Sequence, residues 1–438
     1  MQNSRTLHST SDRLEDRYPY YPEDACNKAP FAKEIRPDEV FEAFGRQALP
    51  KLVRLLQYAP LSEAKRVEAL TLLAGDLLTT ERAAEAVTAG ALEAAAALFE
   101  SGNAEIRALS ARCVGAMLSV RSGRLRAAKS CAASLVGLLA DEARGVRAAA
   151  ACGVRALAAA ADGAALLAAQ PALVAALVAA LPDRDGCAEV DAQVLLALES
   201  VSRSPAGVAA CLAARAERTL VGIAAAADRR HAGSAAQVTW NLASLPAGTR
   251  RVIEAGAVPV LAGIMRRDAA ARRVAAGALL AASVDKAGKQ AIGAGAVVDQ
   301  LCETLLLRGA DADAAVRTNV CETIRSASEL PAVREAFVRR LVLHVDTLES
   351  VLGASSAPVL FAVLKERRSE QLAVAAVSTL LRIAKGSDQG CKDVYGCLYA
   401  VETLTPLKED TNEALQRLAT QLLDLLWRWR ANECGDNC

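Results

Sequence analysis

The feature that most constrains this chain is a three-helix unit of about forty residues that recurs along most of its length. One clear unit runs from Arg230 to Val284. Apolar residues at helical spacing, with glycine where the chain must turn, predict three longer helices within it, at Ser234–Leu245, Ala257–Met265 and Ala269–Ser283. A unit of this kind is typical of a stacked helical repeat rather than of a single globular core.

The period appears in a pattern Ala-Leu-x-x-Leu near the end of each long third helix. Its fourth position falls at Gly75, Ser119, Ala159, Ser200, Asn241, Ala281, Ser326 and Arg382. The successive separations are 44, 40, 41, 41, 40, 45 and 56 residues. The last interval predicts a degenerate unit or an insertion around Leu341–Ser356. The sequence therefore predicts an all-α solenoid of about eight to ten repeats, whose third helices line one concave surface.

Length and composition agree with this architecture. The 438 residues exceed a typical single core, and 53% of them are hydrophobic although only 3% are aromatic. Alanine makes up the difference, and alanine-rich helices favour thin layers over a thick core. Residues 1–36 are predicted to be an extended or disordered leader, 37–430 the solenoid and 431–438 a polar tail.

Both ends of the chain carry aromatic residues. The leader holds Tyr18, Tyr20 and Tyr21 between prolines, and such a segment is either disordered or an extended docking segment for a partner. The last predicted helix, Glu413–Arg430, carries Trp427 and Trp429. We expect these two side chains to cover the exposed end of the stack, as terminal repeats must.

Several classes of function are not supported. A net charge of +1 gives no general case for binding nucleic acid or a membrane surface. The apolar run Ala156–Val178 is interrupted by Asp162, Gly163 and Pro171, which favours two stacked helices over a membrane span. The three histidines are far apart, the twelve cysteines include no CxxC pair, and no catalytic motif occurs. We expect a protein of a reducing compartment that is not an enzyme and holds no metal or cofactor.

Basic side chains are the most conspicuous polar candidates for partner contact. One is Arg382, which belongs to the eight fourth-position residues named above (the rung residues). The others form the doublets Arg229-Arg230, Arg250-Arg251, Arg266-Arg267 and Arg272-Arg273. Two interpretations of the doublets remain open. They are either solvated helix ends, where cations are favoured, or a contact patch for an acidic segment of a partner.

Two sets of residues resemble the armadillo repeat. Trp240 and Asn241 lie in Thr-Trp-Asn-Leu-Ala, and the turns Glu254–Pro259 and Gly295–Val297 have the Gly-Ala-Val form. Both features resemble the armadillo consensus, and the resemblance covers roughly residues 38–430. It implies a right-handed superhelix that binds other proteins. In nuclear-import adaptors of this fold a Trp lies four residues before the Asn, whereas this chain has Gln237 there.

A narrower likeness lies near the N-terminus, in Ala43–Leu52, Arg66–Leu70 and Ala83–Leu92. These stretches resemble the opening of the armadillo-repeat radial spoke proteins of motile cilia and flagella, the spoke head fourteen homologues. The resemblance implies a cytoplasmic, cytoskeletal protein of the axoneme that bridges other spoke proteins in the spoke stalk. The alternative is a soluble armadillo adaptor that binds extended peptide segments, of the nuclear-import or signalling type.

Overall fold

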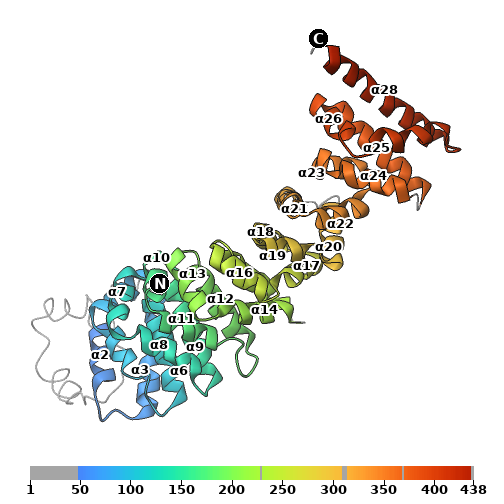
Figure 1. Cartoon of the computed structure of the whole chain (residues 1–438). Helices are drawn as coiled ribbons and strands as arrows, with labels where there is room; N and C mark the ends of the chain where they lie inside the picture. Colours follow the sequence, from blue (N-terminus) through green and yellow to red (C-terminus); the bar gives the residue numbers. More distant parts are fainter. Residues whose placement is uncertain (1–47, 227–228, 308–312, 367–368, 436–438) are drawn as a thin grey trace, which may run out of the picture. The chain divides into compact units, whose positions relative to one another are not determined.

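The computed structural model describes residues 48–226, 229–307, 313–366 and 369–435. The chain divides into two compact units, residues 1–219 (the first unit) and 220–438 (the second unit). Every regular element among the described residues is a helix (Figure 1). The fold is an all-α solenoid of armadillo-like or HEAT-like repeats, as the sequence predicts.

The first unit is a stack of helical layers, in which each long third helix is followed by shorter helices. Its helices are α2 (Ala48–Gln57), α3 (Glu63–Asp76), α4 (Thr80–Thr88), α5 (Ala91–Ala96), α6 (Ala104–Met117), α7 (Arg121–Ser130), α8 (Ala132–Gly137), η2 (Leu138–Ala140), α9 (Arg144–Ala158), α10 (Ala161–Ala168), α11 (Pro171–Ala179), α12 (Ala188–Val201) and α13 (Pro205–Ala213). The third helices α3, α6, α9 and α12 pack consecutively against one another (Figure 1). Helix α14 (Ala216–Ala225) spans the boundary between the units.

Small residues set the spacing of these layers. A Cβ added to Gly115 in α6 would lie 2.9 Å from the Cα of Gly153 in α9, so the two helix backbones are in direct contact there. Leucine and valine side chains such as Val154 and Leu157 are fully buried between the layers. The layers are therefore thin because glycine and alanine leave no side chain to hold the helices apart.

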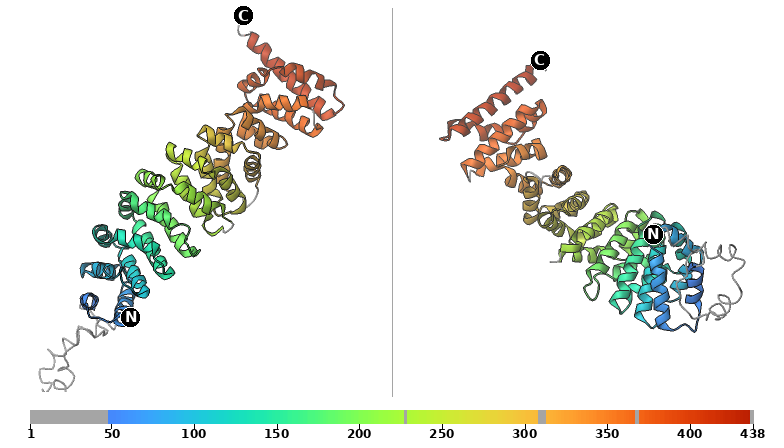
Figure 2. Two further views of the ribbon diagram at one scale, coloured as in Figure 1. Left: turned by 60° about the horizontal axis from the view of Figure 1, so that its bottom comes forward. Right: turned by 180° about the vertical axis from the view of Figure 1, so that it is seen from behind.

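The second unit has the same arrangement of a long third helix followed by shorter helices, except in the last third of its length. It contains η3 (Arg229–His231), α15 (Ala232–Leu242), α16 (Pro246–Glu254), α17 (Ala257–Arg267), α18 (Arg272–Ala282), α19 (Lys286–Ile292), α20 (Gly295–Leu305), α21 (Ala314–Ala327), α22 (Pro331–Leu341), α23 (Val345–Leu352), η5 (Gly353–Ser356), α24 (Ala357–Glu366), α25 (Glu370–Gly386), α26 (Asp388–Tyr395), α27 (Ala400–Leu404), η6 (Thr405–Glu409) and α28 (Glu413–Gly435). Figure 2 shows these helices from two further sides. Helices α23 and η5 lie between the third helices α21 and α25, where the sequence predicts a degenerate unit or an insertion.

All three helices predicted within Arg230–Val284 have different bounds in the structure, where α15 begins at Ala232 rather than Ser234 and α17 ends at Arg267 rather than Met265. The third helix of this repeat, α18, begins at Arg272 rather than Ala269. The reason is that Asp268 Oδ1 accepts hydrogen bonds from the amides of Ala270 and Ala271. Such a turn competes with the helix for the backbone donors. The first helix ends at Leu242 rather than Leu245, since Pro246 begins the next helix.

The glycine at the sharp turn has the backbone conformation that the sequence suggests. Gly256 has φ 81° and precedes α17, and Gly90 has φ 85° and precedes α5. Both residues lie in the left-handed region of backbone conformation, which residues with a Cβ rarely adopt. The same turn therefore occurs once in each unit with the same conformation.

The last helix differs in part from the prediction. Helix α28 runs to Gly435, so the first residues of the predicted polar tail are helical. Leu422 and Leu426 are buried, whereas Trp427 is 50% exposed. The ring of Trp429 lies 5.7 Å from that of Tyr395. Leucines therefore provide much of the packing of this helix, and Trp427 does not cover the end of the stack. The leader and its tyrosines lie outside the described residues.

Within the described residues, one stretch has the length and hydropathy of a membrane span, Val345–Glu366, and half of its most apolar window is buried in the fold. It consists of α23, η5 and α24, all of which contact α25. The pair Arg144–Ala158 and Ala161–Ala168 qualifies only when joined, and it is bent by 109°. Both stretches are packed as repeat helices in the stack.

Candidate functional site

Contacts between helices define which residues are equivalent in successive repeats. Four glycines lie in the first turn of a short helix, each close to a carbonyl oxygen of the preceding third helix. They are Gly123, Gly163, Gly207 and Gly288. The oxygens belong to Met117, Leu157, Val201 and Ala282, at 1.8 to 2.0 Å from a Cβ added to the glycine. Each glycine follows its partner by six residues, so these four partner residues occupy the same repeat position.

This register corrects two of the eight predicted rung residues. Ser119 and Ala159 lie beyond the ends of α6 and α9, whereas the position just before Met117 and Leu157 is held by Ala116 and Ala156. The pattern Ala-Leu-x-x-Leu matched one turn too late there, because alanine-rich helices offer several similar registers. With the correction the first separations become 41, 40 and 44 residues. The rung residues are therefore Gly75, Ala116, Ala156, Ser200, Asn241, Ala281, Ser326 and Arg382.

In the first unit the small rung residues leave a hollow. A depression of about 510 Å³ is lined by Ala116, Cys152, Gly153 and Ala156, with charged residues at its margin. It lies on the third helices α6 and α9 and reaches the first turn of α12. A volume of this size is within the range of ligand pockets, but here the hollow is an open part of a groove.

In the second unit two of the rung residues, Asn241 and Arg382, are larger, and Asn241 contacts the side chain one turn before it. Gln237 Nε2 donates a hydrogen bond of 3.1 Å to Asn241 Oδ1 within α15. The ring of Trp240 lies over Gly277 of α18, where an added Cβ would be 2.7 Å from the ring. Trp240 is thus part of the packing between two third helices, while Gln237 and Asn241 form a half-buried pair of amides.

Arg382 lies on α25 and is bound within the second unit. Its guanidinium pairs with Asp346 and, at 2.6 Å, with Glu349 on the inserted helix α23. Hydrogen bonding to Asp346 and the nearby carboxylates raise the pKa of Arg382. The candidate contact residue therefore fastens the insertion to the adjacent third helix, although half of its side chain stays exposed.

The basic doublets do not form one free patch. Arg267 Nε donates to the carbonyl of Gly263, and Arg272 Nε donates to that of Met265. These bonds satisfy carbonyls near the C-terminus of α17, the place where cations are favoured. Arg273 pairs with Asp313 at 2.8 Å. Arg251 is half-buried in α16 and has polar contacts of its own.

Arg250 and Arg266 are different from the other members of the doublets. Both are exposed, and neither pairs with a residue that the structure describes. They remain candidates for contact with an acidic partner, while the helix-end interpretation fits Arg267 and Arg272.

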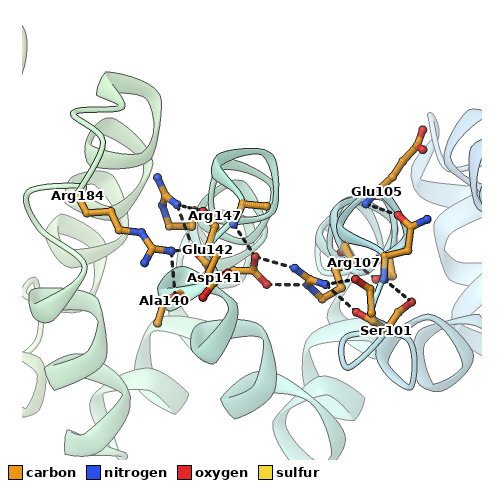
Figure 3. Close-up of polar contacts among 12 residues, drawn as sticks. Ser101, Glu105, Arg107, Ala140, Asp141, Glu142, Arg147 and Arg184 are labelled. Carbon is orange, nitrogen blue, oxygen red and sulfur yellow. Dashed lines mark hydrogen bonds and ion pairs between the residues drawn. The ribbon is translucent and has the colours of Figure 1, made fainter.

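Two ion pairs between an arginine and an aspartate, here called arginine clasps, join successive layers of the first unit. Arg107 pairs with Asp141 at 2.7 and 2.9 Å and donates to the carbonyl of Ser101 at 2.7 Å (Figure 3). The hydrogen bond from Arg107 lowers the pKa of Asp141 and raises the pKa of Arg107. Arg107 therefore bonds both to the loop before its own helix and to the loop before the next third helix.

The second clasp is more deeply buried. Arg147 and Asp183 side chains are 2% and 1% exposed and pair at 2.7 Å. Burial opposes the ionisation of Asp183, but hydrogen bonds from Arg147 and from the amides of Cys187 and Asp185 outweigh it, so its pKa is lowered. A buried pair is tolerated only when its remaining groups are satisfied, and Arg147 Nη1 also donates to the carbonyls of Asp141 and Glu142.

The clasps were not found from the sequence, although a signal was present. Arg66, Arg107 and Arg147 recur at intervals of 41 and 40 residues. Arg66 donates to the carbonyl of Ala59 at 2.8 Å, as the other two arginines do to their own loops. Arg272 occupies the same position ten residues before the end of its third helix, which explains its contact with Met265.

The described residues contain no group of three or more His, Cys, Asp and Glu side chains placed to hold a metal ion. Burial raises the pKa of the thiols of Cys113, Cys211 and Cys302 to about 12. Such thiols are poor nucleophiles at neutral pH.

No protein-family model matches the chain, and no curated protein matches it. Solved structures do. The crystal structure of an engineered protein has a TM-score of 0.57 at 22% identity, covering 86% of this chain and 98% of that one. A structure from a study of the phosphorylation switch that controls the interaction between cadherin and β-catenin has a TM-score of 0.56 at 16% identity, covering 86% of each chain.

A designed armadillo repeat protein in complex with the peptide (KR)4 matches at a TM-score of 0.49 and 21% identity, over 53% of this chain and 99% of that one. At these identities the structural comparisons establish the solenoid fold alone. Function must be argued from the surface of this chain.

Proposed function

We propose that this protein is a non-catalytic scaffold that binds other proteins along its third helices. The observation that carries the proposal is the open, small-residue hollow on α6 and α9, which lets a partner approach the helix backbones closely. A protein of similar fold supplies an analogy, since it comes from a study of the interaction between cadherin and β-catenin.

We further propose that the assembly is the radial spoke of motile cilia or flagella, with the protein as a structural subunit of the spoke stalk. The likeness at Arg66–Leu70 and Ala83–Leu92 supports this proposal. In the structure these residues form α3, α4 and the Gly90 turn of the first unit. The protein would then be cytoplasmic and cytoskeletal, and its partners would be other spoke proteins.

The experiment is a fractionation of isolated, demembranated axonemes. A stalk subunit stays with the axoneme in detergent and leaves it only in high salt, because its many contacts act together. Detection of the protein mainly in the detergent-soluble fraction would contradict the axonemal proposal.

A second candidate function is a soluble adaptor for extended peptide segments. The half-buried amide pair of Gln237 and Asn241 favours it, because side-chain amides can bond the backbone of an extended peptide. An adaptor is recovered in the soluble fraction without salt. Its binding to peptides falls when Asn241 is replaced by Ala, whereas axonemal retention does not depend on that substitution.

A further inference from the structure

The hollow on α6 and α9 carries unpaired charges at its margin. Arg112 of α6 and Glu189 of α12 both line it, and both are exposed. Neither forms a hydrogen bond or ion pair with any residue that the structure describes. Cys152 lies between them, close enough that both charges act on its thiol.

The floor of the hollow is apolar and lies at the level of the backbone. Gly153 is buried, and its neighbour across the layer is Gly115. The walls carry only the methyl groups of Ala116 and Ala156 and the thiol of Cys152. The equivalent position to Cys152 is Gln237 in α15, where a longer side chain covers the surface.

Two arginines lie near the hollow and near Cys152. Arg112 lines the hollow, and Arg155 lies one turn beyond Cys152 on α9 and also acts on that thiol. Arg155 is exposed and likewise pairs with no described residue. Two cations and one carboxylate therefore lie close to Cys152 beside an apolar floor, so the surface complements an occupant with negative charge beside an apolar group.

We propose that this hollow is the anchor site for a segment of a partner protein in which a large aliphatic or aromatic residue follows acidic residues. The apolar side chain fills the space above Gly153, and the acidic residues pair with Arg112 and Arg155. Glu189 disfavours the acidic residues on its own side and so fixes the direction of the segment. This inference rests on the proposed scaffold function and specifies the partner that one part of the surface accepts.

An array of synthetic peptides tests the proposal with the full chain. Three sets share one phenylalanine or leucine and differ only in its neighbours, which are acidic, basic or uncharged. We expect the acidic set to bind best and the basic set worst. Ala156→Trp fills the hollow and weakens binding by about 10- to 100-fold, the equivalent of burying one large apolar side chain.

Ala281→Trp is the matched control, because Ala281 holds the same repeat position in the second unit. It leaves peptide binding unchanged. Arg112→Glu reverses the order of the acidic and basic sets without changing the helical content of the chain. Equal binding of the three sets, or full binding by a folded Ala156→Trp variant, would overturn the proposal.

The same variants separate this inference from the proposed function. If Ala156→Trp and wild-type chains are both retained by demembranated axonemes while the arrays show no charge preference, the anchor site is wrong and the scaffold proposal stands. If the arrays show the preference but the wild-type chain is absent from axonemes, the anchor site stands and the axonemal assignment fails.

Discussion

Each of the two units holds an Arg–Asp pair between neighbouring layers, but the two pairs differ in burial. In the first unit, Arg147 and Asp183 meet across neighbouring layers with 2% and 1% of their side chains exposed. In the second unit, Arg273 and Asp313 also meet across neighbouring layers, but 63% and 36% of their side chains are exposed. The chemistry of the pair is the same, so burial alone separates a clasp that the fold depends on from a solvated surface pair.

A similar contrast holds for the third helices. In the first unit Gly115 meets the backbone of Gly153 and the rung residues are small, which leaves a hollow. In the second unit Gly277 meets the ring of Trp240, and Gln237 bonds to the rung residue Asn241. One repeat plan therefore gives an open hollow on the third helices of one region and side-chain contacts on the third helices of another.

The largest test of this comparison is removal of one arginine from each pair. Arg147→Met leaves Asp183 buried without its partner and is expected to cost about 3–5 kcal/mol of unfolding free energy. Arg273→Met is expected to cost less than about 1 kcal/mol. Urea titrations followed by circular dichroism measure both variants. All three tryptophans lie in the second unit, so tryptophan fluorescence reports on that unit. Equal costs would show that burial does not distinguish the pairs.

The next test compares the two close contacts of glycine. Gly115→Ala forces two helix backbones apart and is expected to cost about 1–3 kcal/mol. Gly277→Ala displaces only a half-buried ring, and we expect a smaller cost with a change in tryptophan emission. Gly75→Ala serves as control, because an added Cβ at Gly75 meets nothing within 4 Å. A larger cost for Gly277→Ala than for Gly115→Ala would contradict this account.

The sharp turns should behave alike in the two units. Gly90→Val and Gly256→Val each force a β-branched residue into the left-handed region, at an expected cost of about 1–3 kcal/mol. Neither added Cβ meets another atom within 4 Å, so strain in the backbone is the only cause. Thermal melts of both variants measure the effect, and a melt identical to wild type at either site would remove strain as the reason for that glycine.

The smallest expected effect is in the acid dependence of stability. Arg107 and Arg147 lower the pKa values of Asp141 and Asp183 in the folded chain. Their contribution is therefore present above the unfolded value of about 3.9 and is lost as pH falls through the folded values. We expect Asp141→Asn to flatten the fall in stability below about pH 4.

High salt sharpens the same comparison. The pKa of Asp313 is also lowered, chiefly by its hydrogen bond with Arg273, but this pair is exposed and screened by ions. Acid unfolding of the second unit should therefore depend more on salt than that of the first, as followed by fluorescence and circular dichroism. An equal salt effect on both would argue against the difference in burial.

Much of the fold follows from the sequence. The forty-residue period, the helix type of each segment, the left-handed Gly256 and the insertion before α25 all depend on local patterns that a single repeat displays. The bounds of single helices were less accurate where a side chain such as Asp268 competes for backbone donors. The prediction that Ser119 and Ala159 are rung residues was wrong, because the sequence of an alanine-rich helix looks similar when it is shifted by one turn.

The sequence by itself determined that this chain stacks three-helix repeats, because helical periodicity and turn glycines act within each repeat. Only the tertiary structure decided which arginines are buried, which rung residues leave a hollow and which charges at its margin stay unpaired. These properties depend on atoms about forty residues apart that meet across layers. Arg147 and Arg273 both lie in the first turn of a third helix, and packing buries the first in an ion pair and leaves the second in water.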